Sequence, residues 1–312
     1  MMKIRKGFVR LLVILWGFFP MIQAIISCSS GEKDPVQEEY LVTYSEWKNN
    51  RVRSLKGPEG WLNLAGLFWL EEGENLFGSD SSNSIIFPPV APGKIGAIIL
   101  KEDKIWFIVN PGVNVKHEGE LIREMDLLPD VSGEPTLLKL DSLAWFIIKR
   151  GDRYGIRLRD YNHPNIVKLD SIPCFPPDLV WKVKATFEPF MKPGTIQVPN
   201  VIGMVEESPV PGLLTFNIGK QELTLYPMGD PDHLFLVFGD ETSGLETYGA
   251  GRFLTIDAPD KEGNYTIDFN RAYNPPCAFT LYATCPLPPK ENILPIRITA
   301  GEKAVEGFGY HH

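Results

Sequence analysis

Two polar blocks in the second half of the chain carry the side chains best suited to chemistry. The first block follows an apolar run at residues 234–238 and places Asp240 and Thr242 among closely spaced glycines. Because glycine readily adopts positive φ, this loop can bend tightly and bring its backbone close to a ligand. Arg252 ends the block, where a guanidinium can bind a carboxylate or phosphate with two hydrogen bonds. The block predicts a polar loop that faces a ligand.

The second block begins at the end of a predicted strand. Asp268 and Asn270 occupy alternate positions there and should face the same side, and the next residues enter a proline-bounded loop. We expect the two blocks to meet at one pocket for a polar small molecule or glycan. Its predicted ligand-binding residues are Asp240, Thr242, Tyr248, Arg252, Asp268, Asn270, Tyr273 and Asn274.

The same residues permit two other functions. Asp240 or Asp268 as general base, with Arg252 stabilising developing negative charge, would give a metal-independent hydrolase of esters or glycosides. In a purely structural interpretation, Asp and Asn cap turns, and Arg252 pairs with Asp268 in a buried network. A third possibility is a structural or protein-interaction module that uses the N-terminal half of the chain.

Motifs for metals, nucleotides and activated nucleophiles are absent from the sequence. The five histidines, at positions 117, 163, 233, 311 and 312, show no His-x-x-x-His spacing, and no Cys-x-x-Cys occurs. There is also no Walker loop, dinucleotide fingerprint or Gly-x-Ser-x-Gly elbow. The sequence therefore predicts neither a metal site nor a cofactor.

The N-terminus has the build of a secretory signal. Four basic residues precede an apolar core at residues 11–19, which is shorter than the roughly 20 residues of a membrane span. The segment ends in Ile25-Ile26-Ser27-Cys28, which resembles the lipobox of bacterial lipoproteins. That resemblance implies removal of residues 1–27, lipid on Cys28, and a membrane-anchored protein of the cell envelope, on the periplasmic or outer-membrane face.

The charge of the chain limits its partners. Removal of residues 1–27 takes away four positive charges and moves the formal net charge from −8 to −12. This negative net charge argues against nucleic acid as a binding partner, because nucleic-acid binding requires clustered Lys and Arg. It also argues against electrostatic adhesion to anionic lipid, so the lipid on Cys28 would provide the membrane attachment. Residues 28–39 are polar and predict a flexible tether.

The pattern of apolar runs and turns predicts a mainly β fold. The chain has 28 glycines and 27 prolines, and its short apolar runs are separated by turn residues, as in antiparallel sheets. One helix is expected at residues 39–53, where aromatic residues recur at helical spacing. Four hairpins are predicted, at residues 95–109, 143–159, 213–226 and 253–269.

Two family resemblances follow from local motifs. Residues 73–160, with Gly73 to Ser79 and the turn Asn114 to Ile122, resemble a forkhead-associated (FHA) β-sandwich, although Ser79 replaces the phosphate-binding arginine. The motifs Tyr273-Asn-Pro-Pro-Cys-Ala-Phe279 and Cys285-Pro-Leu-Pro-Pro289, with Gly60 to Gly73 and Ala300 to Lys303, resemble the domain-of-unknown-function family 1684. This second resemblance implies no reaction.

The predicted organisation has two β units. It comprises a lipoprotein signal peptide at 1–27, a tether at 28–39, a helix plus FHA-like β-sandwich at 40–160, a linker at 161–179, and a C-terminal β unit with the polar site at 180–305. Besides Cys28, three cysteines remain, Cys174, Cys277 and Cys285. An extended segment 278–284 would hold the last two about 26 Å apart, so no local disulfide is expected, and Cys277 is expected to be an inert buried thiol.

Overall fold

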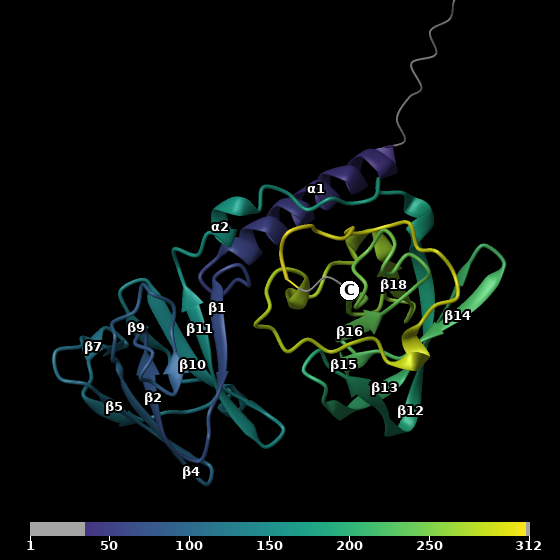
Figure 1. The fold of residues 1–312 in the computed structure, drawn as a ribbon. Helices are drawn as coiled ribbons and strands as arrows, with labels where there is room; N and C mark the ends of the chain where they lie inside the picture. Colours follow the sequence, from purple (N-terminus) through teal and green to yellow (C-terminus); the bar gives the residue numbers. More distant parts are fainter. Residues whose placement is uncertain (1–34, 310–312) are drawn as a thin grey trace, which may run out of the picture.

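The computed structural model describes residues 35–309, and in this part the protein is mainly β. One long helix, α1 (Pro35–Lys56), lies across one side of the molecule, and two groups of strands lie beneath it (Figure 1). The predicted fold class, mainly β with an N-terminal helix and antiparallel sheets, is confirmed. The helix is longer than the predicted 39–53 and buries Tyr40, Tyr44 and Leu55.

The N-terminal half is a two-sheet structure around one aromatic core. Trp145 is fully buried and its ring contacts Phe77 and Phe107 of the facing sheet and Phe87, which follows the last strand residue Ile86. The six-stranded sheet has the order β1 (Leu64–Trp69), β11 (Arg153–Asp160), β10 (Leu143–Arg150), β9 (Leu138–Leu140), β6 (Lys116–His117) and β7 (Glu120–Leu121). The five-stranded sheet has the order β3 (Ile85–Ile86), β2 (Gly73–Gly78), β4 (Gly96–Lys101), β5 (Lys104–Val109) and β8 (Glu124–Asp126).

The C-terminal half has its own core between two smaller sheets. Phe269 contacts Phe216 and Phe238, which come from opposite sheets. One sheet has the order β14 (Gln221–Leu225), β13 (Val205–Ile218), β12 (Lys182–Pro199) and β18 (Tyr265–Asp268), and the other has β15 (Met228–Asp230), β16 (His233–Phe238) and β17 (Arg252–Asp257). The chain after β18 is mostly irregular and covers this core (Figure 1).

Three of the four predicted hairpins form, and the fourth does not. β4–β5, β10–β11 and β13–β14 pair antiparallel as expected. Residues 253–257 and 265–268 do not pair with each other, because β17 pairs with β16 and β18 pairs with β12. The loop between them therefore crosses from one sheet to the other, and on its free edge β17 pairs through Phe253 with Tyr273 instead.

The helix and the predicted linker both pack on the C-terminal half. Leu55 of α1 shares a buried cluster with Ile172 of the linker and Phe279 near the C-terminal end. The linker also hydrogen-bonds to the C-terminal segment, through Phe175 N–H to the Gly301 carbonyl at 3.0 Å. The sequence grouped the helix with the N-terminal sandwich. In the structure, the buried face of α1 lies against the C-terminal half instead. The predicted signal peptide and Cys28 lie outside the described residues.

Candidate functional site

Asp240 and Arg252 form a sealed ion pair inside the C-terminal half. The Arg252 Nη2 lies 3.0 Å from the Asp240 Oδ2, and the two side chains are 1% and 0% exposed. The guanidinium also donates to the carbonyls of Ala300 and Ile298. Burial lowers the pKa of Arg252, and the Asp240 carboxylate opposes that shift. Neither side chain can reach a ligand in solution.

The loop after β16 folds around the Asp240 carboxylate. Its Oδ1 accepts from the Thr242 N–H at 3.1 Å and from the Thr242 hydroxyl at 2.6 Å, and its Oδ2 accepts from the Ile298 N–H at 2.7 Å. Thr242 is itself fully buried and hydrogen-bonds Thr247. The prediction that Asp240, Thr242 and Arg252 contact a ligand is therefore wrong, because these groups satisfy one another. For the same reason Asp240 is not a general base for an external substrate.

Asp268 belongs to a second, separate group near α1. Its carboxylate accepts from the Tyr40 hydroxyl at 3.0 Å and from the Asn270 N–H at 3.2 Å, and it lies 3.5 Å from the Arg271 Nε. Burial and the adjacent Asp268 raise the pKa of Tyr40. The predicted pairing of Asp268 with Arg252 is wrong, since Arg252 pairs with Asp240. Asp268 instead fixes the start of α1 to the end of β18.

Asn270 faces away from solvent and binds the linker. Its Oδ1 accepts from the Asp178 N–H at 3.0 Å, and its Nδ2 donates to the Asp178 carbonyl at 2.8 Å. The side chain is fully buried. Asn270 therefore holds Asp178, the residue that caps the 3₁₀ turn Leu179–Trp181 before β12, and its predicted role in ligand binding is not supported by its position.

A polar cleft lies where β17 and β18 fail to pair. It has a volume of about 320 Å³ and brings together Asp268, Arg271 and Lys182 with exposed polar side chains of both strands. Its lining residues are Lys182, Leu254, Thr255, Asp257, Ala258, Asp260, Asn264, Thr266, Asp268 and Arg271. Among the eight predicted ligand-binding residues, Asp268 lines this cleft.

A third group joins α1 to the end of the chain. The Arg51 Nε lies 3.1 Å from the Glu302 Oε1, and the Glu302 Oε2 accepts from the Asn274 N–H at 2.7 Å. Arg51 also stacks over the Tyr273 ring at 4.7 Å. Burial raises the pKa of Glu302, although Arg51 and Arg252 oppose this. Tyr273 and Asn274 thus support the docking of α1, and they do not line the cleft.

Glu302 and Arg51 were not predicted as functional or structural partners. Arg51 lies on the same face of α1 as the buried Tyr44 and Leu55, but a charged helix residue is ordinarily expected to be solvated, and Glu302 is 251 positions away in sequence. Glu302 lies in the stretch Ala300 to Lys303 that resembles the domain-of-unknown-function family 1684. That stretch alone does not indicate which residue Glu302 pairs with. Only the folded chain shows that this carboxylate is 1% exposed.

Tyr248 lies in a buried cluster with two cysteines. Cys277 and Cys285 are 0% and 4% exposed, and the Cys277 N–H lies 3.1 Å from the Cys285 Sγ. The expected extended segment between them is wrong, because a 3₁₀ turn, η4 (Pro276–Ala278), folds the chain back. Both thiols are free, and burial raises the pKa of the Cys285 thiol. Tyr248 is therefore a core residue, not a ligand-facing one.

Part of the C-terminal half is similar to a known protein family. Residues 168–303 match the family model described as protein of unknown function DUF1684. This match covers less than half of the chain, and we call residues 168–303 the DUF1684 region. The match includes both polar blocks and the two motifs that resemble this family, and it begins after residues 60–73, which also suggested it. The resemblance to an FHA sandwich is not confirmed.

Comparisons with curated proteins and with solved structures do not indicate an activity. Curated proteins provide no match to the chain. The solution NMR structure of an uncharacterized protein from Haloarcula marismortui is similar, with 29% sequence identity over 44% of this chain and 78% of that chain, at a TM-score of 0.37.

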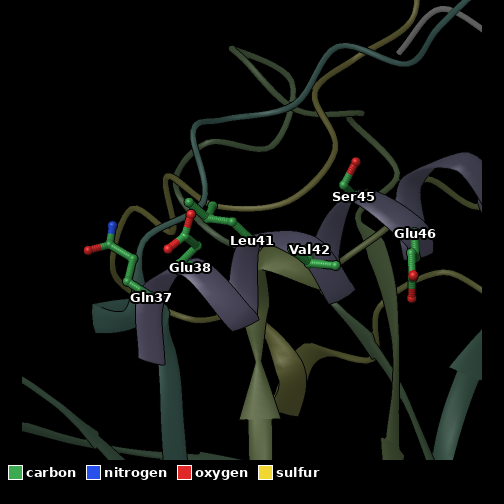
Figure 2. A pocket seen from close by; sticks show the side chains of 6 residues that line it. All are labelled: Gln37, Glu38, Leu41, Val42, Ser45 and Glu46. Atoms are coloured by element: carbon green, nitrogen blue, oxygen red, sulfur yellow. The ribbon is translucent and has the colours of Figure 1, made fainter. Parts of the chain in front are cut away.

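Two other hollows lie away from the β17–β18 cleft. One, of about 350 Å³, is lined by the glycines of the first polar block together with Pro288 and Ile293. Asp240 borders it only through its main chain, because the side chain is unexposed. The other, of about 580 Å³, lies along the outward face of α1, and Figure 2 shows the described residues that line it, Gln37, Glu38, Leu41, Val42, Ser45 and Glu46.

The predicted single pocket therefore separates into distinct groups. The Asp240–Arg252 pair, the Asp268 group and the Arg51–Glu302 group each form hydrogen bonds or ion pairs within their own set of residues. Between residues 35 and 309, no cluster of three or more His, Cys, Asp or Glu side chains is arranged to hold a metal ion. No helix in that range has the length and apolar character needed to cross a membrane.

Proposed function

We propose that this protein is a lipid-anchored protein of the cell envelope that binds a polar small molecule or short glycan in the cleft between β17 and β18. The proposal is based on the side chains of both charges that line this cleft. Lys182 and Arg271 provide donors, and Asp257 and Asp260 provide acceptors. Such a lining suits a ligand with several hydroxyl groups or with charges of both signs.

The hydrolase alternative receives less support. A general base needs hydrogen-bond reach to the proton that it removes. Asp240 has no exposed side-chain surface, and both oxygens of Asp268 already accept from Tyr40. We therefore assign the cleft to binding and propose no reaction.

Substitution of Asp257 tests the cleft. Asp257 is exposed and lines the cleft, so Asp257→Ala should leave the melting temperature of the free protein unchanged. A panel of sugars, polyols and amino acids is screened for ligands that stabilise the wild type. For such a ligand we expect Asp257→Ala to weaken binding about tenfold, as expected for loss of one hydrogen bond to a charged group.

Asp230→Ala is the matched control, because Asp230 is also an exposed aspartate at a strand end but lies outside the cleft. It should bind like the wild type in isothermal titration calorimetry. Equal affinity of the Asp257→Ala and Asp230→Ala variants, or no stabilising compound in the panel, would contradict the assignment.

The anchor rests on the N-terminal sequence, whose arrangement of basic residues, apolar core and Ile25-Ile26-Ser27-Cys28 supports lipidation. Expressed in a bacterium that processes lipoproteins, the full chain should incorporate labelled fatty acid and sediment with membranes. Cys28→Ala should lose both properties, whereas Cys174→Ser should retain them. Label that persists in Cys28→Ala would refute lipidation at this cysteine.

A further inference from the structure

Arg157 presents a buried positive charge that the described protein does not neutralise. Its side chain lies on β11, whose alternate residues Tyr154, Ile156 and Leu158 fill the sandwich core. Arg157 points to the opposite face, yet the residue is only 4% exposed. Its Nε has no hydrogen-bond partner in the described part of the chain.

Burial lowers the pKa of Arg157 to about 10, and the nearby Arg150 guanidinium adds to this shift. The Asp130 carboxylate opposes this shift, but it is already engaged, because it lies 2.8 Å from the Arg150 Nη1 and accepts from the Lys149 N–H. The Trp61 ring, 5.7 Å from the Arg157 guanidinium, provides a weak cation–π contact. An unpaired buried charge is costly, so a counterion is expected.

Both guanidinium groups converge on one residue of the DUF1684 region. The Thr284 hydroxyl oxygen lies 3.1 Å from the Arg150 Nε and 3.3 Å from the Arg157 Nη2. Thr284 and Arg150 line a cavity of about 230 Å³ at the junction of the two halves. Asn200 and Ser208 add neutral polar groups to the wall, and Glu206, which also lines it, is exposed to solvent.

We infer that this junction cavity binds a compact oxyanion, either phosphate or a small carboxylate, through Arg150 and Thr284, with Arg157 adding positive charge from behind Thr284, which separates it from the cavity. Guanidinium groups recognise such anions through paired, charge-assisted hydrogen bonds. The volume admits a small anion and excludes a nucleotide. The site is distinct from the β17–β18 cleft, so it does not depend on the function proposed for that cleft.

Thermal unfolding of the full protein, with phosphate, acetate or chloride added at matched ionic strength, tests the inference. Phosphate or acetate should raise the melting temperature saturably above the chloride value, and the more effective anion defines the ligand class. Arg157→Met should raise the melting temperature in anion-free buffer, because it removes an unpaired buried charge. It should also weaken the anion response.

Arg153→Met is the matched control, because Arg153 lies on the same strand and also stacks on a tryptophan, Trp69, but is exposed. It should keep the full anion response. Arg150→Met, a partly exposed position, should fold and weaken binding about tenfold. If neither anion exceeds chloride, or if Arg150→Met or Arg157→Met responds like the wild type, the site is refuted.

Discussion

Arg252→Ala should reduce the free energy of unfolding by about 3–5 kcal/mol, the usual cost of removing one partner from a buried ion pair. The substitution leaves the Asp240 carboxylate charged at a position with no solvent access. It also leaves the carbonyls of Ala300 and Ile298 without their donor. Chemical denaturation followed by circular dichroism measures this loss.

Arg297→Ala is the matched control for this prediction. Arg297 pairs with Glu246 in the same half, but the two side chains are 46% and 36% exposed, so its loss should cost less than about 1 kcal/mol. The double variant Asp240→Asn/Arg252→Met should lose less free energy of unfolding than the sum of the losses in the single variants Asp240→Asn and Arg252→Met. Similar losses for Arg252→Ala and Arg297→Ala would contradict a structural role for the sealed pair.

Gly301→Ala should destabilise the protein by about 2–5 kcal/mol, for two separate reasons. Gly301 has a φ of +79°, which costs an alanine about 1–2 kcal/mol. An added Cβ would also lie 2.5 Å from the Ala272 carbonyl oxygen and 2.8 Å from that of Phe269. Both obstacles are backbone atoms, so relief requires movement of the main chain, at about 1–3 kcal/mol.

Gly203→Ala separates these two causes. Gly203 has nearly the same φ, +82°, but its added Cβ would have no neighbour within 4 Å. Its loss should therefore be limited to the conformational cost of about 1–2 kcal/mol. Urea unfolding of both variants measures the difference. Equal losses would show that close packing around Gly301 does not contribute.

Local patterns in the sequence determined the class of the fold. Apolar runs around short turns correctly predicted β4–β5, β10–β11 and β13–β14, because each hairpin depends on residues close together in the chain. Tyr40 and Tyr44 revealed the buried face of α1 through their spacing. The DUF1684 motifs likewise identified the family of residues 168–303.

The local sequence pattern predicted the wrong pairing where a strand had more than one possible neighbour. The run after Arg252 and the run ending at Asp268 are separated by a turn-rich loop, as in a hairpin, yet each pairs with a different neighbour. Which strands pair depends on how segments that are distant in sequence come together in the sheet, and a local sequence pattern does not contain this information. The polar cleft exists because of this outcome.

The polar blocks show what composition determines and what tertiary structure decides. The sequence established that Asp240, Arg252 and Asp268 are concentrated in two short segments, where binding, catalysis and internal pairing were all compatible with the residue types. Besides neighbours in the chain, they have distant partners, for example Arg252 for Asp240, 12 positions away, and Tyr40 for Asp268, 228 positions away. Because burial and partner geometry arise only when distant segments pack, the tertiary structure alone decided that Asp240 is sealed and that Asp268 borders an open cleft.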